Sequence, residues 1–216
     1  MPDQTGKTIT KIEPQKGRKD RVSIFLDGQF GFGIHQNLLV DFNLFRGKIL
    51  AEEEITEILK SEEHTSAKER AFRWLSNRSH SEKEIAQKLQ RAKFGKETIE
   101  WVIGELNRLK FLDDAGFARM YAHDRLLKRP IGKKLLTMEL RQKGIDAETT
   151  DRVVKEAYSE KSELELAETL LKKKAPSYAR FDPQKARKKA ADFLAQRGFG
   201  WEVISEVLEK AQKIIA

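Results

Sequence analysis

The sequence predicts a mainly α-helical protein in which tandem three-helix repeats form a curved, elongated rod, preceded by a small antiparallel β-sheet region. Three observations support this fold class. A helix end, a glycine and a second helix recur at a near-constant period. The hydrophobic share of 39% is low for one large core, and the charged share of 35% exceeds the ~25% of average domains. Apolar and polar residues alternate near the N-terminus.

The recurring phrase is clearest at residues 138–154. We expect Gly144 at a helix end, because glycine adopts the left-handed conformation there without a steric cost. Asp146 would cap the next helix by accepting from free backbone N–H groups. Gly198 holds the place of Gly144 in the last copy, and Lys93 holds it in the first. The apolar positions of the copies are Leu89, Phe94 and Val102; Leu140, Ile145 and Val153; and Leu194, Phe199 and Val207. Such self-similarity predicts stacked units.

The first 50 residues favour strands. Residues 8–14 and 21–33 have strand character, and Asp27-Gly28 separates two runs, which is a strong signal for a two-residue hairpin turn. Residues 29–34 would form the return strand, and residues 16–21 a basic turn before the hairpin. We therefore expect a three-stranded antiparallel sheet, followed by a short helix at residues 37–43.

The domain organisation follows from helix start signals. Three Ser-x-x-Glu sequences, beginning at Ser66, Ser81 and Ser162, can each act as a capping box. Asp113-Asp114 suits a helix N-terminus, as does Asp182 before Pro183. The predicted divisions are a sheet region with a short helix at 1–50, a connecting helix at 51–65, and three-helix repeats at 66–112, 113–159 and 160–216.

Composition limits the possible partners. The chain has 216 residues, a net charge of +8 and a pI near 9.5, which suits nucleic acid, an acidic protein or an anionic membrane surface. It has no cysteine, which excludes disulfides and thiolate metal sites. No apolar run approaches the ~18 residues of a membrane span. The N-terminus lacks the apolar core of a signal peptide, so we expect a cytoplasmic protein with no membrane partner.

The residues that usually carry catalysis do not form a recognisable set. Histidines at 35, 64, 80 and 123 lack metal-ligand spacing, so no metal site is expected. Asp113-Asp114 could be a metal-binding pair, but a helix start explains both acids at once. We predict no catalytic residue, no cofactor and no enzyme activity.

Positive charge is concentrated in two segments. Residues 119–143 hold eight Lys or Arg against two acids, and residues 169–191 hold eight against one. A solvated face is the ordinary explanation of such a run, but two runs in matching parts of adjacent repeats favour a surface that faces a polyanion. Few aromatic residues interleave with these cations, Tyr178 and Phe181 being the exceptions, which favours contacts with the nucleic-acid backbone over base stacking. The first basic segment comprises Arg125, Lys128, Arg129, Lys133, Lys134, Arg141 and Lys143. The second basic segment comprises Lys172, Lys173, Lys174, Arg180, Lys185, Arg187, Lys188 and Lys189.

Several motifs together resemble the RecX family. They are Asp113-Asp114-x2-Phe117-Ala118 with Tyr121, Arg125 and Pro130-x-Gly132; Glu139-Leu140-Arg141-Gln142-Lys143-Gly144-Ile145; and the phrase from Phe193 to Ile204. The resemblance covers residues 67–211, and the N-terminal sheet looks like the variable leader of some members. The chain departs from the family pattern at Lys93 and at residues 128–132.

The resemblance implies a function. RecX proteins are non-catalytic regulators of the RecA recombinase in homologous recombination, DNA repair and the SOS response. They lie in the groove of the filament of RecA on single-stranded DNA and limit its extension, ATPase and strand exchange. The expected partners are therefore this filament and DNA, either single-stranded or double-stranded. We expect the protein to bind them as a monomer. The alternative is a basic helical-repeat protein that binds nucleic acid alone.

Overall fold

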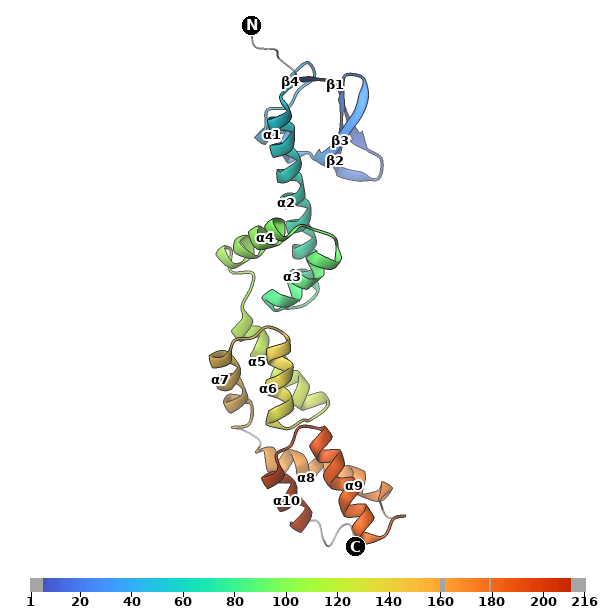
Figure 1. Cartoon of the computed structure of the whole chain (residues 1–216), viewed down its shortest axis with the longest axis vertical. Coiled ribbons are helices and arrows are strands. Elements are labelled where there is room, and N and C mark those ends of the chain that lie inside the picture. The colour runs from blue at the N-terminus through green and yellow to red at the C-terminus, as the bar shows by residue number, and fades with distance from the viewer. Residues whose placement is uncertain (1–5, 160–161, 179, 211–216) are drawn as a thin grey trace. The chain divides into compact units, whose positions relative to one another are not determined.

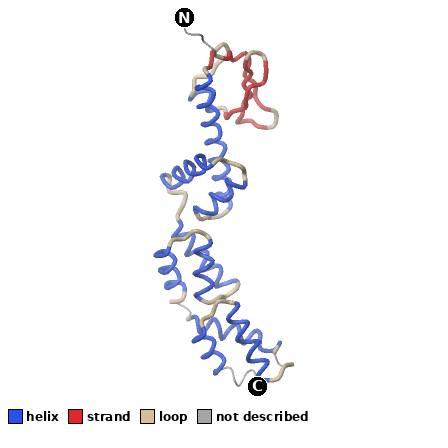
Figure 2. Tube along the Cα trace, viewed as in Figure 1, coloured by secondary structure: helices blue, strands red, loops and turns tan. Residues whose placement is uncertain are grey.

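The computed structural model describes residues 6–159, 162–178 and 180–210. Among these residues the protein has four strands, all within the first 50 residues, and ten α-helices with one short 3-10 helix (Figures 1 and 2). The predicted fold class is confirmed in its main terms: the chain is mainly helical, its helices form tandem three-helix domains, and an antiparallel sheet precedes them.

The sheet is antiparallel, with the strand order β3-β2-β1-β4. The hairpin turn was predicted correctly, since Asp27 and Gly28 both have positive φ, at 49° and 84°. The bounds are β1 Lys7–Gln15, β2 Arg18–Leu26, β3 Gln29–His35 and β4 Ile49–Leu50.

Two details of the sheet prediction were wrong. The sheet has a fourth strand, β4, which pairs with Lys7 and Thr8 of β1. Two residues are too few for an alternating pattern to reveal. The basic turn expected at residues 16–21 is confined to Lys16 and Gly17, because Arg18 already pairs with Gln15 in the ladder.

The sheet packs its apolar face against α2 (Glu52–Asn77), with α1 (Asn37–Asp41) beside it. The fully buried residues Ile9 and Ile24 alternate with half-buried ones, as a one-sided sheet requires, and Ile34 of β3 is fully buried beside them. Leu50 of β4 and Ile58 of α2 complete this core.

The connecting helix and the first helix of repeat 1 are one element. Ser66 was expected to begin a helix, but it lies inside the 26-residue α2. Neither glycine nor proline occurs in α2, so nothing interrupts the backbone at Ser66. The Ser-x-x-Glu pattern alone therefore does not locate a helix start. The remaining domain boundaries stay predictions.

The other helices follow in threes. In the first group α2 is followed by α3 (Glu82–Arg91) and α4 (Lys96–Arg108). The second group is α5 (Asp114–Lys128), α6 (Lys133–Gln142) and α7 (Ala147–Ala157). The third is α8 (Glu163–Lys174), the 3-10 turn η1 (Ala175–Ser177), α9 (Pro183–Gln196) and α10 (Trp201–Lys210).

The glycine breaks were predicted correctly. Gly144 and Gly198 both have positive φ, at 92° and 81°, and end α6 and α9. Lys93 has φ 71° at the equivalent place after α3, so this conformation is formed there without glycine. Asp146 accepts from the backbone N–H of Thr149, and Ser162 forms a complete capping box with Glu165.

The described residues divide into two compact units, one containing 6–78 and 85–111, the other 79–84 with 112–159, 162–178 and 180–210. The curved rod predicted from the sequence stays a prediction. None of the described helices combines the length and hydropathy that a bilayer-spanning segment needs.

The second unit repeats one end-to-end helix contact. The Ser81 hydroxyl, at the start of α3, donates to the carbonyl of Lys143 at the end of α6 (2.7 Å). Gly132, at the start of α6, donates its backbone N–H to the carbonyl of Arg197 at the end of α9 (2.8 Å). The positive end of each helix dipole thus meets the negative end of the next, which is the favourable arrangement.

Carboxylates from the first helix of the next group complete these junctions. Asp114 of α5 accepts from the backbone N–H of Glu82 in α3 (2.8 Å), and Glu163 of α8 accepts from that of Lys133 in α6 (2.9 Å). Each acid satisfies an N–H that the helix itself leaves open. The same acid therefore begins one helix and caps another, which fixes how neighbouring elements meet.

Candidate polyanion-binding interface

The first basic segment contains one residue that is committed to internal contacts. Arg125 donates from Nε and Nη2 to the two carboxylate oxygens of Glu139, at 2.9 and 3.0 Å, and from Nη1 to the carbonyl of Arg129 at 2.6 Å. The hydrogen bonds to Glu139 raise the pKa of Arg125. Its donors thus hold α5 against α6 and are not directed at a partner.

Tyr121 belongs to the same cluster. Its hydroxyl donates to Glu139 at 2.8 Å. Burial, and then the hydrogen bond to Glu139, raise the pKa of Tyr121 to about 12. The phenol therefore stays protonated as a donor, and the cluster holds the inner sides of α5 and α6 together.

Lys143 and Lys128 are also paired. The Lys143 Nζ lies 2.6 Å from a carboxylate oxygen of Glu84 and 4.7 Å from the centre of the Tyr121 ring. Lys128 pairs with Asp124 one turn earlier in α5, at 2.6 Å, with both side chains largely exposed. An exposed pair contributes little, so Lys128 is easily released to an anion, whereas Lys143 is half-buried and helps to join α3 to α6.

The other cations of the first basic segment are exposed. Arg129 ends α5, Lys133 and Lys134 open α6, and Arg141 lies in its last turn. The Nζ of Lys133 lies 5.6 Å from the Tyr158 ring. Among the described carboxylates none forms an ion pair with these four side chains. They are the part of the segment that can meet a partner.

In the second basic segment all side chains are exposed. Lys172, Lys173 and Lys174 form the last turn of α8, whose buried side is made by Leu166, Ala167 and Leu171. Cations suit a helix C-terminus because of the partial negative charge there. The three ammonium groups therefore need no carboxylate partner to be tolerated at this position.

Helix α9 separates an apolar face from a basic one. Ala186, Ala190 and Leu194 recur at helical spacing and are fully buried. The exposed positions between them carry Lys185, Arg187, Lys188 and Lys189. The small alanines let α9 pack closely, so its lysines and arginine project from a supported helix.

Three cations lie close to the ring of Phe181, which precedes α9. The Arg180 guanidinium lies 5.0 Å from its ring centre, and the Nζ atoms of Lys185 and Lys189 lie 5.7 and 4.8 Å from it. Lys185 and Lys189 are one turn apart and so share a face. Tyr178, by contrast, is buried. Of the two aromatic residues in this segment, Phe181 is therefore the one whose ring could contact a ligand.

Sequence reasoning found the basic residues but not all of their partners. The spacing of Asp124 and Lys128 could have shown their pairing, because residues four apart meet on a helix. The pairing of Arg125 with Glu139, and of Lys143 with Glu84, joins different helices and leaves no signal in local spacing. The structure thus separates internal cations from exposed ones.

Taken together, fold and surface define a class: a tandem three-helix-repeat protein whose second and third repeats carry exposed cations on supported helices. Four family models match in chain order. They are the Regulatory protein RecX N-terminal domain at residues 7–51 and the first, second and third three-helix domains of RecX at residues 67–106, 113–154 and 161–208. The chain belongs to the RecX family.

Curated relatives agree over nearly the whole chain. The regulatory protein RecX of Clostridium acetobutylicum is 32% identical over 206 residues, which cover 94% of this chain and 95% of that protein. That of Clostridioides difficile is 34% identical, with 94% of each chain covered. The regulatory protein RecX of Staphylococcus aureus strain Newman is 33% identical over 207 residues, which cover 94% of this chain and 74% of that protein.

Solved structures have the same fold. A crystal structure described as that of regulatory protein RecX matches with a TM-score of 0.73 and 28% identity, covering 94% of this chain and 99% of the other. RecX from Lactobacillus salivarius matches with a TM-score of 0.58 and 24% identity over 69% of this chain and 97% of the other.

Proposed function

We propose that this protein is a non-catalytic regulator of the RecA recombinase. It binds in the groove of the filament of RecA on single-stranded DNA and limits filament extension, ATP hydrolysis and strand exchange during DNA repair and the SOS response. The observation that carries the proposal is membership of the RecX family along almost the full chain. The exposed cations of the second basic segment supply the contact surface.

Repeated helical units suit a repetitive target. A filament offers the same acidic or phosphate groups many times, so two basic segments on one chain gain affinity from simultaneous weak contacts. Exposed cations steer the encounter and can be released at higher salt. Within the proposed surface we include the exposed residues of both segments and exclude Arg125, whose donors are directed at Glu139 and Arg129.

Co-sedimentation with filaments tests the proposal. Full-length protein is mixed with RecA filaments, or with bare single-stranded DNA, across a salt series. We expect filament binding and inhibition of DNA-dependent ATP hydrolysis. The variant Lys172→Glu, Lys173→Glu, Lys174→Glu should bind more weakly while folding normally, because exposed charge changes usually alter stability by no more than about 0.5 kcal/mol each.

A matched variant controls for net charge. Lys16, Lys96 and Lys155 are exposed residues outside both basic segments, and their reversal to Glu changes the net charge by the same amount. This variant should bind almost as the unchanged protein does. Equal loss in both variants would attribute the effect to bulk charge. Unchanged ATP hydrolysis and strand exchange in the presence of excess protein would overturn the proposal.

The cations around Phe181 favour a second candidate function, direct binding of nucleic acid without RecA. Arg180, Lys185 and Lys189 surround an aromatic ring, and such a group can hold a phosphate beside a base. This function predicts strong, steeply salt-dependent binding to bare DNA. Sedimentation with bare DNA that equals sedimentation with filaments would favour it over RecA regulation.

A further inference from the structure

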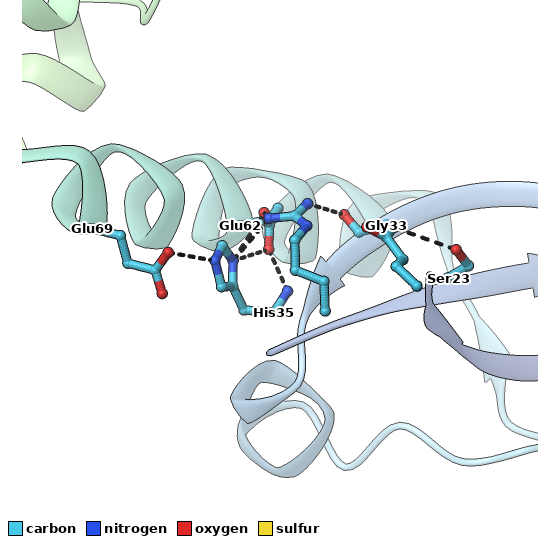
Figure 3. Close-up of polar contacts among 7 residues, drawn as sticks. Ser23, Gly33, His35, Glu62 and Glu69 are labelled. Carbon is cyan, nitrogen blue, oxygen red and sulfur yellow. Dashed lines mark hydrogen bonds and ion pairs between the residues drawn. The ribbon is translucent and has the colours of Figure 1, made fainter. Parts of the chain in front are cut away.

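His35 lies between two carboxylates at the junction of the sheet and α2. It ends β3 and is buried, with 4% of its surface exposed. Its Nδ1 lies 2.9 Å from a carboxylate oxygen of Glu62, and its Nε2 lies 2.9 Å from one of Glu69 (Figure 3). Both ring nitrogens therefore face carboxylate oxygens, which makes the surroundings of the ring attractive to a cation.

The Nδ1 side is closed by other contacts. Glu62 is buried, accepts from the backbone N–H of His35 at 2.7 Å, and is paired with Arg21 at 2.5 Å. The same guanidinium donates to the carbonyl of Gly33 at 3.2 Å, and its Nη1 lies 3.2 Å from Nδ1 of His35. These contacts hold Glu62 and the imidazole in place, which leaves the Nε2 side for an added cation.

Three candidate ligand atoms lie close together at His35. An oxygen of Asp20, an oxygen of Glu69 and a ring nitrogen of His35 lie within 4.8 Å of one another. Two ligands of one zinc ion are at most about 4.2 Å apart, since each bond is about 2.1 Å. Asp20 is exposed and Glu69 half-buried, so neither carboxylate is enclosed by the core, and binding an ion would require their side chains to rotate closer together.

We propose that Asp20, His35 and Glu69 bind a divalent transition-metal ion. One imidazole with two carboxylates suits zinc or manganese, whereas magnesium prefers oxygen ligands alone. The contact from Nδ1 to Glu62 is the outer carboxylate that a metal-binding histidine usually has. The three carboxylates and the one guanidinium of the cluster together leave two negative charges, which a divalent ion balances.

The proposed ion would join β2, β3 and α2. A ligand that binds the folded state and not the unfolded one stabilises the fold, so metal should stabilise the N-terminal unit. Histidine spacing could not predict this site, because its ligands come from three elements far apart in the sequence. The inference is independent of any role in RecA regulation.

Metal titration of the full-length protein tests the inference. After dialysis against a chelator and its removal, ZnCl2 and MnCl2 are added separately, with binding followed by calorimetry and melting by thermal unfolding. We expect one ion per chain and a higher melting temperature. Asp20→Asn and Glu69→Gln should each weaken binding by more than about tenfold. Both retain side-chain size and remove a charge at a position that is not buried, so they should fold.

Glu57→Gln is the matched control, since Glu57 is an exposed acid on α2 outside the cluster. It should bind metal as the unchanged protein does. The inference is overturned if neither ion binds stoichiometrically, or if Asp20→Asn and Glu69→Gln bind as tightly as Glu57→Gln. It is also overturned if ¹⁵N spectra show both ring nitrogens of His35 protonated and unaffected by zinc.

Discussion

At the residue scale, Gly198 shows why a helix end in this fold requires glycine. Its φ of 81° is costly for other L-residues, and a Cβ there would lie 2.3 Å from Cβ of Leu135 and 2.6 Å from its backbone nitrogen. The start of α6 therefore approaches too closely for any side chain. Lys93 has a similar φ, which shows that the conformation alone is tolerated and that the close contact is the added restriction at Gly198.

Gly198→Ala should destabilise the fold by about 2–4 kcal/mol, the sum of the left-handed strain and an overpacked contact. Chemical denaturation of the full-length chain, followed by circular dichroism, measures the change. Gly104→Ala is the control, because Gly104 lies inside α4 with open space where a Cβ would be. That variant should gain about 0.5–1 kcal/mol. A smaller loss for Gly198→Ala than about 1 kcal/mol would contradict the tight contact.

Arg125 is predicted to stabilise the fold, although its charge suggested a role in binding a partner. Arg125→Ala leaves the half-buried carboxylate of Glu139 without its main partner and should cost about 2–3 kcal/mol. Lys134→Ala, at an exposed position of the same basic segment, should cost less than about 0.5 kcal/mol. Thermal unfolding compares the two. Equal stability of both variants would place Arg125 among the exposed binding cations.

Tyr121 gives a pH dependence with a defined sign. Its pKa is raised from 10.0 to about 12, chiefly by burial and then by the hydrogen bond to Glu139. A raised pKa in the folded state means that the stabilisation is complete below pH 10.0 and is lost as the pH rises towards about 12. Burial also raises the pKa of Tyr158 and of Tyr178, so ultraviolet titration of Tyr121→Phe should show one late-ionising phenol fewer than that of the unchanged protein. Ionisation of every tyrosine near the ordinary value would disprove the buried hydrogen bond.

At the element scale, the sequence predicted helix ends better than helix starts. Glycine with an apolar neighbour marked the ends of α6 and α9, because glycine adopts the left-handed conformation there without a steric cost. Ser81 and Ser162 marked helix starts as expected, whereas Ser66 did not. A serine only begins a helix where the preceding residues leave the helical conformation, and that depends on packing with other elements.

The contacts between neighbouring helices could not be predicted. Asp113 and Asp114 lie at the start of α5 as predicted, Asp113 as the N-cap that accepts from Gly116 and Asp114 in the first turn. What was not predicted is that the carboxylate of Asp114 also caps α3. A carboxylate that serves a distant helix leaves no trace in local spacing. For the same reason, local sequence spacing does not reveal the cluster around His35, whose members lie far apart along the chain.

Asp114 allows the carboxylate cap to be tested. Burial, with the nearby charges of Glu82, Asp113 and Asp146, raises its pKa, so the fold favours its neutral form and the stabilisation from this group falls as the pH rises through that raised pKa. Asp114→Asn keeps an acceptor oxygen without the charge and should be at least as stable as the unchanged chain at neutral pH. Asp114→Ala should lose about 1 kcal/mol. The denaturation midpoints of the two variants measure the difference in stability. If Asp114→Asn were less stable than Asp114→Ala, the role of Asp114 as a cap would be refuted.

At the scale of the whole molecule, composition and repeat spacing predicted the fold class, and the family followed from the resemblance of several motifs to RecX. Charge density predicted where exposed cations lie, and every cation of the second basic segment is exposed. It could not distinguish Arg125 or Lys143 from their neighbours, because burial and pairing depend on how helices meet. Binding predictions for the whole chain therefore rest on the exposed subset.

The salt dependence of binding can decide what the lysines at the end of α8 contact. If Lys172, Lys173 and Lys174 each neutralise a phosphate of single-stranded DNA, their joint reversal should reduce the slope of log K against log salt by about 2, since each contact contributes about 0.7. If they face acidic groups of RecA, the slope on bare DNA should stay unchanged while filament binding weakens. Fluorescence anisotropy on bare DNA and on filaments, with the Lys16, Lys96 and Lys155 reversal as control, measures both. Because the three lysines are exposed and lie outside the buried side of α8, either result concerns contact and not folding.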